Sequence, residues 1–133
     1  GEDGGAYNSG QNGTTNRFIS AFWSLTELGT FARAGFSVYC RQTLLGGNYG
    51  LIDKDTLKPN PDFFAFLLFK RLMGPRALEV KTDSGDPYLK VFAHCSRPVA
   101  GGAKGGVALL LINFHPSEDV RIGNIGTRNI LHS

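Results

Sequence analysis

The chain has 133 residues, 41% of them apolar and 19% charged, which is typical of a folded globular protein and argues against a disordered tail. No apolar run approaches the ~20 residues of a membrane-spanning helix. The net charge of +3 comes from scattered Lys and Arg residues without an aromatic-rich basic run. These features argue against a nucleic-acid partner and favour an anionic sugar or small ligand.

The first half of the sequence alternates between loop, helix and strand patterns. Residues 1–16 are rich in Gly, Asn and Ser and are expected to form a loop. From Arg17, apolar residues recur every three or four positions, which predicts a helix capped by Asn16 and ended by a left-handed Gly35. Residues 36–42 are rich in β-branched and aromatic side chains, which predicts a strand.

A second glycine-rich loop and a second helix follow. Residues 43–60 are expected to form the loop, with glycines at its centre. Asn60 followed by Pro61 is typical of a helix start, because Asn caps the helix and Pro is tolerated in its first turn. This helix is expected to end at residues 74–75. The alternation up to about Arg76 indicates an α/β fold.

Beyond Arg76 the pattern changes to short strands separated by turns. The predicted strands are residues 77–81, 88–95, 107–114 and 119–122. We therefore predict two parts, an α/β part in residues 1–76 and an antiparallel β part in residues 77–133.

Neither the cysteines nor the histidines suggest a metal site. Cys40 and Cys95 are too far apart for ligand spacing, and each is predicted to be a buried thiol in a strand. His94 and His115 lie in or beside predicted strands without Cys or acidic partners at ligand spacing, so structural roles are favoured. We expect neither a metal nor an organic cofactor.

The two polar loops are the best candidates for a functional site. Loops that follow parallel strands of an α/β barrel share one rim, where catalytic groups gather. The first loop offers the carboxylate of Glu2, although composition alone favours its interpretation as an ordinary loop acid. Amide, hydroxyl and phenol groups suited to sugar hydroxyls are found at Tyr7, Asn8, Ser9, Gln42, Asn48 and Tyr49.

The opening motif GEDGGAYNSG resembles the nucleophile motif of glycoside hydrolase family 79, which contains heparanases and β-glucuronidases. The likeness continues in order through FWSLTELGTFARAGFSVYCRQTLLGGNYGLID, NPDFFAFLLFKRLMG, VFAHCS and GVALLLINF. Within the family, the sequence resembles the plant heparanase-like proteins in particular. It implies that residues 1–76 are the C-terminal part of a (β/α)8 TIM barrel and that residues 77–133 begin an antiparallel β-sandwich. The chain would then be cut from a longer protein at both ends.

The resemblance also implies a retaining hydrolase that cleaves β-glucuronide linkages. Two carboxyl groups do this chemistry, one attacking the sugar and one protonating the leaving oxygen. The resemblance makes Glu2 the nucleophile and places the acid/base glutamate upstream of Gly1. The sugar-holding positions of the family carry over to Tyr7, Asn8, Ser9, Gln42, Gly47, Asn48 and Tyr49.

The sequence departs from animal heparanases at the expected wall of the sugar site. Those proteins have glycines at the positions of Asn8 and Ser9, and their second loop is one residue longer before GNY. We therefore expect a plant cell-wall or matrix glycan, or a glucuronide conjugate, as substrate. The family pattern pairs Cys95 with a cysteine beyond this chain, so Cys95 is not expected to pair with Cys40.

Two other functions remain open. A non-catalytic carbohydrate-binding protein on the same fold would lack the upstream acid. A structural β-sandwich module would act through residues 77–133, and Glu2→Gln would leave it unchanged. The Asn-Gly-Thr triplet at residues 12–14 permits glycosylation, and we expect a secreted cell-wall or vacuolar (lysosomal) protein, with membrane association left open.

We predict that the 133-residue chain on its own is inactive and does not fold stably. A complete barrel takes roughly 250 residues, so two or three of its units leave strand edges and helix faces uncovered. Circular dichroism and a glucuronide turnover assay check this prediction. Cooperative unfolding together with turnover by the isolated chain would contradict it.

Overall fold

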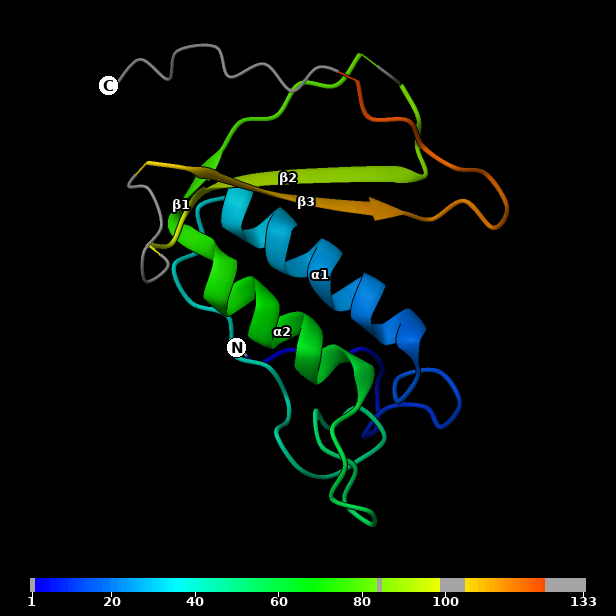
Figure 1. Ribbon diagram of the computed structural model, residues 1–133. Coiled ribbons are helices and arrows are strands. Elements are labelled where there is room, and N and C mark those ends of the chain that lie inside the picture. Colours follow the sequence, from blue (N-terminus) through cyan, green and yellow to red (C-terminus); the bar gives the residue numbers. More distant parts are fainter. Residues whose placement is uncertain (1, 84, 99–104, 124–133) are drawn as a thin grey trace.

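The computed structural model describes residues 2–83, 85–98 and 105–123. Figure 1 shows the helices lying side by side against the sheet. The elements in chain order are α1 (Phe18–Arg33), α2 (Pro61–Leu72), β1 (Met73–Leu78), β2 (Leu89–Ser96) and β3 (Val107–Asn113). No helix in the described part of the chain is long and apolar enough to cross a membrane.

Helix α1 is confirmed, but its cap differs from the prediction. The N-cap is Arg17, not Asn16. The Asn16 amide is engaged in the preceding turn, where its Oδ1 accepts from the Gly13 N–H at 2.8 Å and its Nδ2 donates to Asn12 Oδ1 at 2.9 Å. A side chain held there is not available to cap the helix.

The predicted end of α1 at Gly35 is confirmed. Gly35 has φ +85, which an L side chain rarely adopts. Its N–H bonds to Ala32 O at 3.1 Å, and the Phe36 N–H bonds to Phe31 O at 3.0 Å. The rings of Phe31 and Phe36 stack with centroids 5.1 Å apart. Together these contacts form a Schellman motif, which satisfies the last carbonyls of the helix and turns the chain back.

The predicted strand at residues 36–42 is wrong as a continuous element. Only one parallel bridge is present, between Asp3 and Arg41. The Asp3 N–H donates to Cys40 O at 2.9 Å, and the Gln42 N–H donates to Asp3 O at 2.7 Å. A ladder needs a partner along its length, and among the described residues only the segment at Asp3 pairs with this one. Cys40 is consequently exposed, not a buried thiol.

Helix α2 begins at Pro61 as predicted, with Asn60 as its N-cap. The Asn60 side chain makes no cap hydrogen bond, because its Nδ2 donates to Gly50 O at 2.8 Å and ties the helix start to the second loop. The helix ends at Leu72, earlier than the expected residues 74–75.

Strand β1 follows α2 without a loop, so it begins at Met73 and not at the predicted residue 77. Pro75 within it lacks an N–H for pairing, and the register with β2 is irregular between Met73 and Ala77. A proline is tolerated at such an irregularity because no ladder bond is lost there. The Gly74 carbonyl oxygen lies 2.7 Å from Nδ1 of buried His94, consistent with the structural role predicted for this histidine.

The sheet is an antiparallel meander in the order β1-β2-β3. Strands β2 and β3 lie within one residue of their predicted bounds. The strand predicted at residues 119–122 is wrong, because that segment is irregular and has no pairing partner among the described residues. The described chain is thus an α/β piece with a three-stranded sheet, while the barrel and the second sheet of a sandwich stay predictions.

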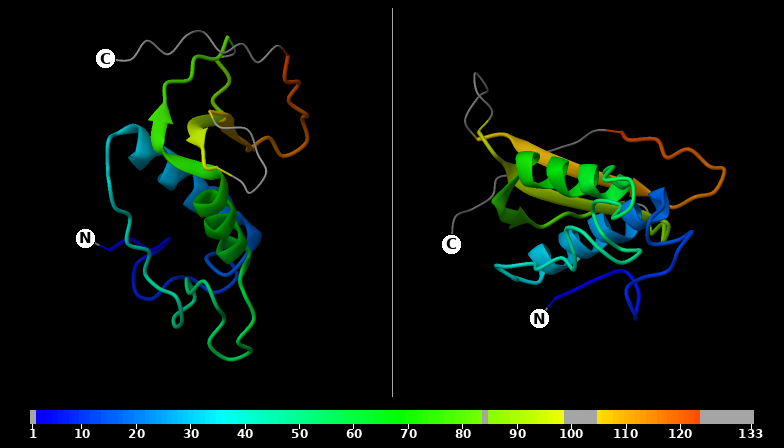
Figure 2. Two further views of the ribbon diagram at one scale, coloured as in Figure 1. Left: turned by 60° about the vertical axis from the view of Figure 1, so that its left-hand side comes forward. Right: turned by 90° about the horizontal axis from the view of Figure 1, so that it is seen from below.

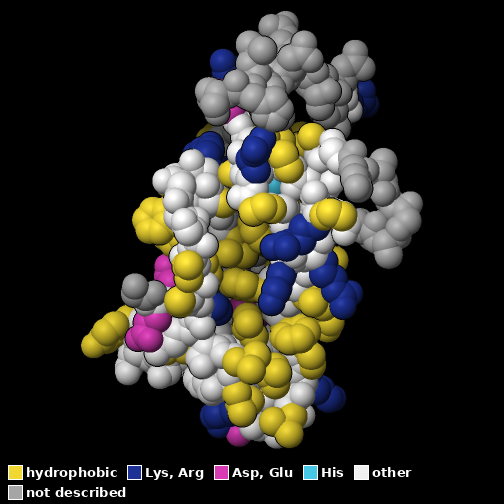
Figure 3. All heavy atoms as spheres, turned by 90° about the vertical axis from the view of Figure 1, so that its left-hand side faces the viewer, with side chains coloured by type: hydrophobic (Ala, Val, Ile, Leu, Met, Phe, Trp, Pro, Cys, Tyr) yellow, Lys and Arg dark blue, Asp and Glu magenta, His cyan; other side chains and the backbone are white. Residues whose placement is uncertain are grey.

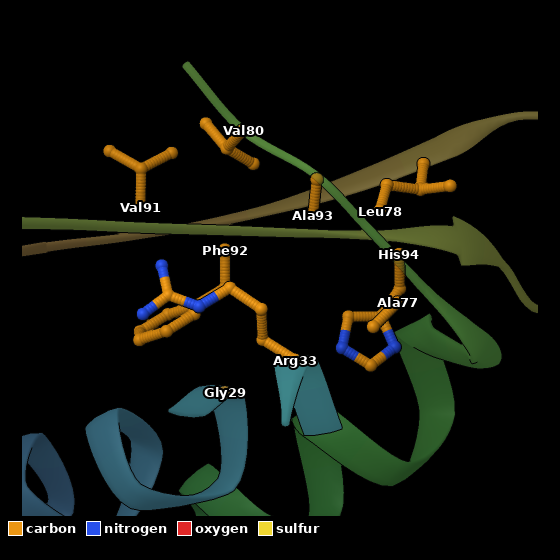
Figure 4. Close-up of a pocket in the computed structure, with 9 residues that line it drawn as sticks. All are labelled: Gly29, Arg33, Ala77, Leu78, Val80, Val91, Phe92, Ala93 and His94. Atoms are coloured by element: carbon orange, nitrogen blue, oxygen red, sulfur yellow. The ribbon is translucent and has the colours of Figure 1, made fainter. Parts of the chain in front are cut away.

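The sheet rests on the helices where a glycine leaves room for an aromatic ring. Figure 4 shows the Phe92 side chain of β2 pointing toward α1 at Gly29, with Arg33 beside it. A Cβ on Gly29 would overlap the Phe92 ring. The cavity left here is only about 10 Å³, enough for about one water molecule and too small for a ligand.

Other apolar surfaces remain exposed among the described residues. Phe64, Leu68 and Leu72 are spaced by four and form an apolar stripe on α2, each about half exposed. Phe36 and Val38 are 63% and 73% exposed. Figure 3 shows apolar side chains gathered on one face of the molecule. Such a surface is unusual for an isolated stable domain, in line with the expectation that the chain alone is unstable.

We predict that Gly29→Ala lowers the melting temperature of the full-length protein. Alanine gains about 1 kcal/mol in helix propensity, but overlap with Phe92 in a packed interface costs about 1–3 kcal/mol. Differential scanning calorimetry measures the change. Gly85→Ala is the control, because a Cβ there meets nothing within 4 Å. A Gly29→Ala protein as stable as this control would contradict the packing described above.

Candidate active site

The two glycine-rich loops lie against each other, as predicted. The Asn48 N–H donates to Ser9 O at 2.6 Å, and the Thr15 hydroxyl donates to Asn48 O at 2.8 Å. Figure 1 shows both loops at the end of the molecule away from the sheet. The chain therefore brings residues some forty positions apart into one surface.

Close backbone contact explains glycines in both loops. A Cβ on Gly10 would lie 2.8 Å from Tyr49 N, and one on Gly47 would lie 2.7 Å from Ser9 O. Asn8 and Ser9 have φ of 55 and 69, a left-handed conformation that costs energy in residues other than glycine. Strained backbone of this kind clusters at binding and catalytic sites.

Glu2 precedes the parallel bridge and is exposed. Side chains alternate between the two sides of an extended chain, and paired residues of a bridge point to the same side. Asp3 and Arg41 therefore share one side, toward the helices, and Glu2 and Gln42 share the other. This register places the candidate nucleophile on a common face with Gln42, the residue that precedes the second loop.

Beneath that face lies a buried ion pair that the sequence analysis missed. Arg41 Nη2 is 2.9 Å from Asp62 Oδ2, and the two side chains are 5% and 0% exposed. The same Nη2 donates to Tyr49 O at 2.8 Å, and Ser20 Oγ donates to Asp62 Oδ2 at 3.2 Å. Burial raises the pKa of Asp62, while Arg41 and Ser20 oppose that effect.

Aromatic rings enclose the guanidinium group. Its Cζ lies 5.5 Å from the ring centroid of Trp23 and 5.9 Å from those of Tyr49 and Phe66. Arg41 thereby contacts α1, α2 and the second loop at once. The available signals were an arginine directly after the apolar run at residues 38–40 and an aspartate in the first turn of an apolar helix. Their pairing becomes visible only in three dimensions.

The structure distinguishes among the predicted sugar-binding residues. Tyr7 is 97% exposed, and Asn8, Ser9, Gly47 and Asn48 are also exposed, while Gln42 is half-buried. Tyr49 is only 7% exposed, and its ring packs against Gly4 and over Arg41. A sugar role for each residue stays a prediction, and Tyr7 is the tyrosine of the two whose ring is free to stack on a ligand.

Among residues 2–83, 85–98 and 105–123, no cluster of three or more His, Cys, Asp or Glu residues could hold a metal ion. His115 Nε2 lies 2.9 Å from Asp86 Oδ2, a pair at the edge of the sheet and remote in the chain from the two loops. Cys40 and Cys95 are both free thiols, and Cys95 is half-buried, not fully buried as predicted.

The sequence that forms this surface is similar to that of known proteins. Residues 1–29, which contain the first loop and most of α1, match the family model described as glycosyl hydrolase family 79, N-terminal domain. The chain is 51% identical over 122 residues to heparanase-like protein 1 of Arabidopsis thaliana, covering 92% of this chain and 21% of that protein. The chain belongs to glycoside hydrolase family 79.

Two further relatives agree with this family 79 assignment. Heparanase-like protein 2 of Arabidopsis thaliana is 42% identical over 135 aligned positions, covering 100% of this chain and 24% of that protein. Baicalin-beta-D-glucuronidase of Scutellaria baicalensis is 42% identical over 122 residues, covering 92% of this chain and 22% of that protein. The family 79 chain thus spans only 21–24% of the length of these relatives. Their names support glycosidase activity in the family.

We predict that Arg41→Met and Asp62→Leu each lower the stability of the full-length protein by about 3–5 kcal/mol, because each leaves a buried charge unpaired. The double substitution should cost clearly less than the sum, since no charge is then left alone. Urea unfolding of the four proteins measures this. The exposed pair Lys54 and Asp55 is the control, and its substitution should change stability by less than about 1 kcal/mol. Additive effects at Arg41 and Asp62 would contradict the assigned role.

Proposed function

We propose that the full-length protein is a retaining glycoside hydrolase that cleaves β-glucuronide linkages, with Glu2 as the nucleophile. One observation carries the proposal: Glu2 is exposed on the face that it shares with Gln42, beside two interlocked loops, within the residues that match the family model. An exposed carboxylate on a short bridged segment is held in place and remains accessible to a sugar.

In the proposed reaction the ionised Glu2 attacks the anomeric carbon and forms a glycosyl ester. An acid/base glutamate, which the family resemblance places before Gly1, protonates the leaving oxygen and then activates the water that cleaves the ester. The exposed groups of Asn8, Ser9 and Asn48 are suited to hydrogen bonds with sugar hydroxyls, and the Tyr7 ring to stacking on the sugar.

We propose a glucuronide conjugate or a glucuronic-acid-containing wall or matrix glycan as the substrate. The name of the Scutellaria relative, a β-D-glucuronidase, supports the sugar class. Asn8 and Ser9 supply polar side chains at the loop surface, where they favour a compact, hydroxyl-rich ligand. We further propose that the protein is secreted to the cell wall or delivered to the vacuole.

One observation favours a second candidate, a carbohydrate-binding protein without catalysis. The contacts that join the loops use Ser9, Thr15 and Asn48, and none of them involves Glu2. The sugar-binding surface would therefore persist if the catalytic acids were lost.

We predict that a 2-deoxy-2-fluoro glucuronide inactivator labels the full-length protein on the peptide that carries Glu2. Glu2→Gln should abolish the label and lower kcat by on the order of 10⁴-fold or more, because the covalent route is removed. Peptide mapping by mass spectrometry locates the label. Glu79→Gln is the matched control, because its carboxylate is 80% exposed and lies just after the end of β1, remote in the chain from the two loops. A folded protein that binds the sugar but takes no label would favour the second candidate.

A further inference from the structure

A second carboxylate lies on the opposite side of the segment that carries Glu2. Glu27 of α1 accepts a hydrogen bond from the Tyr39 hydroxyl at 2.6 Å. Tyr39 directly precedes Cys40, whose carbonyl oxygen accepts a hydrogen bond from the Asp3 N–H at 2.9 Å. The Asp3 carboxyl group is among the causes that raise the pKa of Glu27. Three separate segments of the chain thus meet at Glu27, and one of them contains Glu2.

Two carboxyl groups in direct contact are stable only when they share a proton. Burial and the hydrogen bond with Asp3 raise the pKa of Glu27 from 4.5 to about 7, while Tyr39 and the charge of Arg41 oppose the rise. Burial and Glu27 also raise the pKa of Tyr39 far above its usual range, so its hydroxyl stays a donor. Asp3, Tyr39 and Arg41 are the titratable and charged groups that act on Glu27.

We propose that Glu27 is a positioning residue, whose protonated carboxyl group donates to Asp3 and fixes the segment that presents Glu2. The backbone of Asp3 is already held on both sides by Cys40 and Gln42. The contact with Glu27 also restrains the Asp3 side chain, and this fixes the direction of the neighbouring Glu2. This inference rests on the proposed function of Glu2.

Loss of the Glu27 proton would remove this restraint on Asp3. An ionised Glu27 repels the Asp3 carboxyl group and no longer donates to it, so the segment that also carries Glu2 loses this contact. The protonated form of Glu27 is therefore the active form, and activity should fall as pH rises through about 7. The stability of the protein is expected to change with pH in the same direction as its activity. Native Glu27 keeps its proton between pH 4.5 and about 7 while unfolded Glu27 does not, so this contribution to stability declines across that window as pH rises.

The test uses Glu27→Gln and Glu27→Ala in the full-length protein. A glutamine amide donates to Asp3 at every pH and still accepts from Tyr39, so it mimics the protonated acid. We expect Glu27→Gln to move the alkaline limb of kcat/KM upward by about one pH unit or more. Glu27→Ala, which offers no donor, should lower kcat below about pH 7 more than it changes KM, and the difference from the wild-type protein should shrink above that pH. Glu79→Gln is again the control for removal of one exposed carboxylate.

A melting-temperature series from pH 4.5 to 7 provides a readout that does not require turnover. Glu27→Gln should flatten the decline seen in the wild-type protein. An unmoved alkaline limb, or an unchanged melting profile, would overturn the positioning role. If the wild-type protein does not hydrolyse a glucuronide, the proposed function fails, and the positioning of a nucleophile fails with it. The melting series then still shows whether Asp3 and Glu27 share a proton.

Discussion

The buried ion pair between Arg41 and Asp62 is the contact on which the candidate site depends. One guanidinium group joins the first turn of α2, the carbonyl of Tyr49 and the ring of Trp23 on α1. A charge in this position is tolerated only with its partner and its hydrogen bonds in place. The relative placement of both helices and the second loop is consequently fixed together, because no one of them can shift without exposing an unpaired charge.

The extended segment at the start of the chain connects this interior to the surface. Asp3 lies on the side of the helices, where its carboxyl group raises the pKa of Glu27, while Glu2 lies on the opposite face. The alternation of side chains along an extended chain thus lets one short segment be anchored on one side and reactive on the other. The opposing loop approaches closely because Gly10 and Gly47 have no side chain.

Local sequence signals predicted the elements whose stabilising contacts are local. The apolar periodicity and Gly35 located α1, and Asn60 with Pro61 located the start of α2. The pattern at residues 36–42 predicted a continuous strand that is not present, since strand pairing depends on neighbours that the pattern does not reveal. The residues of the candidate site came from a family motif, whereas Arg41, Asp62 and Glu27 act through partners 8 to 42 positions away and carry no local signature.

The most direct test of this account is a crystal structure of the full-length protein trapped as its fluoroglucuronyl ester. The account predicts an ester on Glu2, with the sugar between Asn8 and Asn48 and with Arg41 and Asp62 still paired beneath it. An ester on another carboxylate, or a sugar bound away from the two loops, would contradict it.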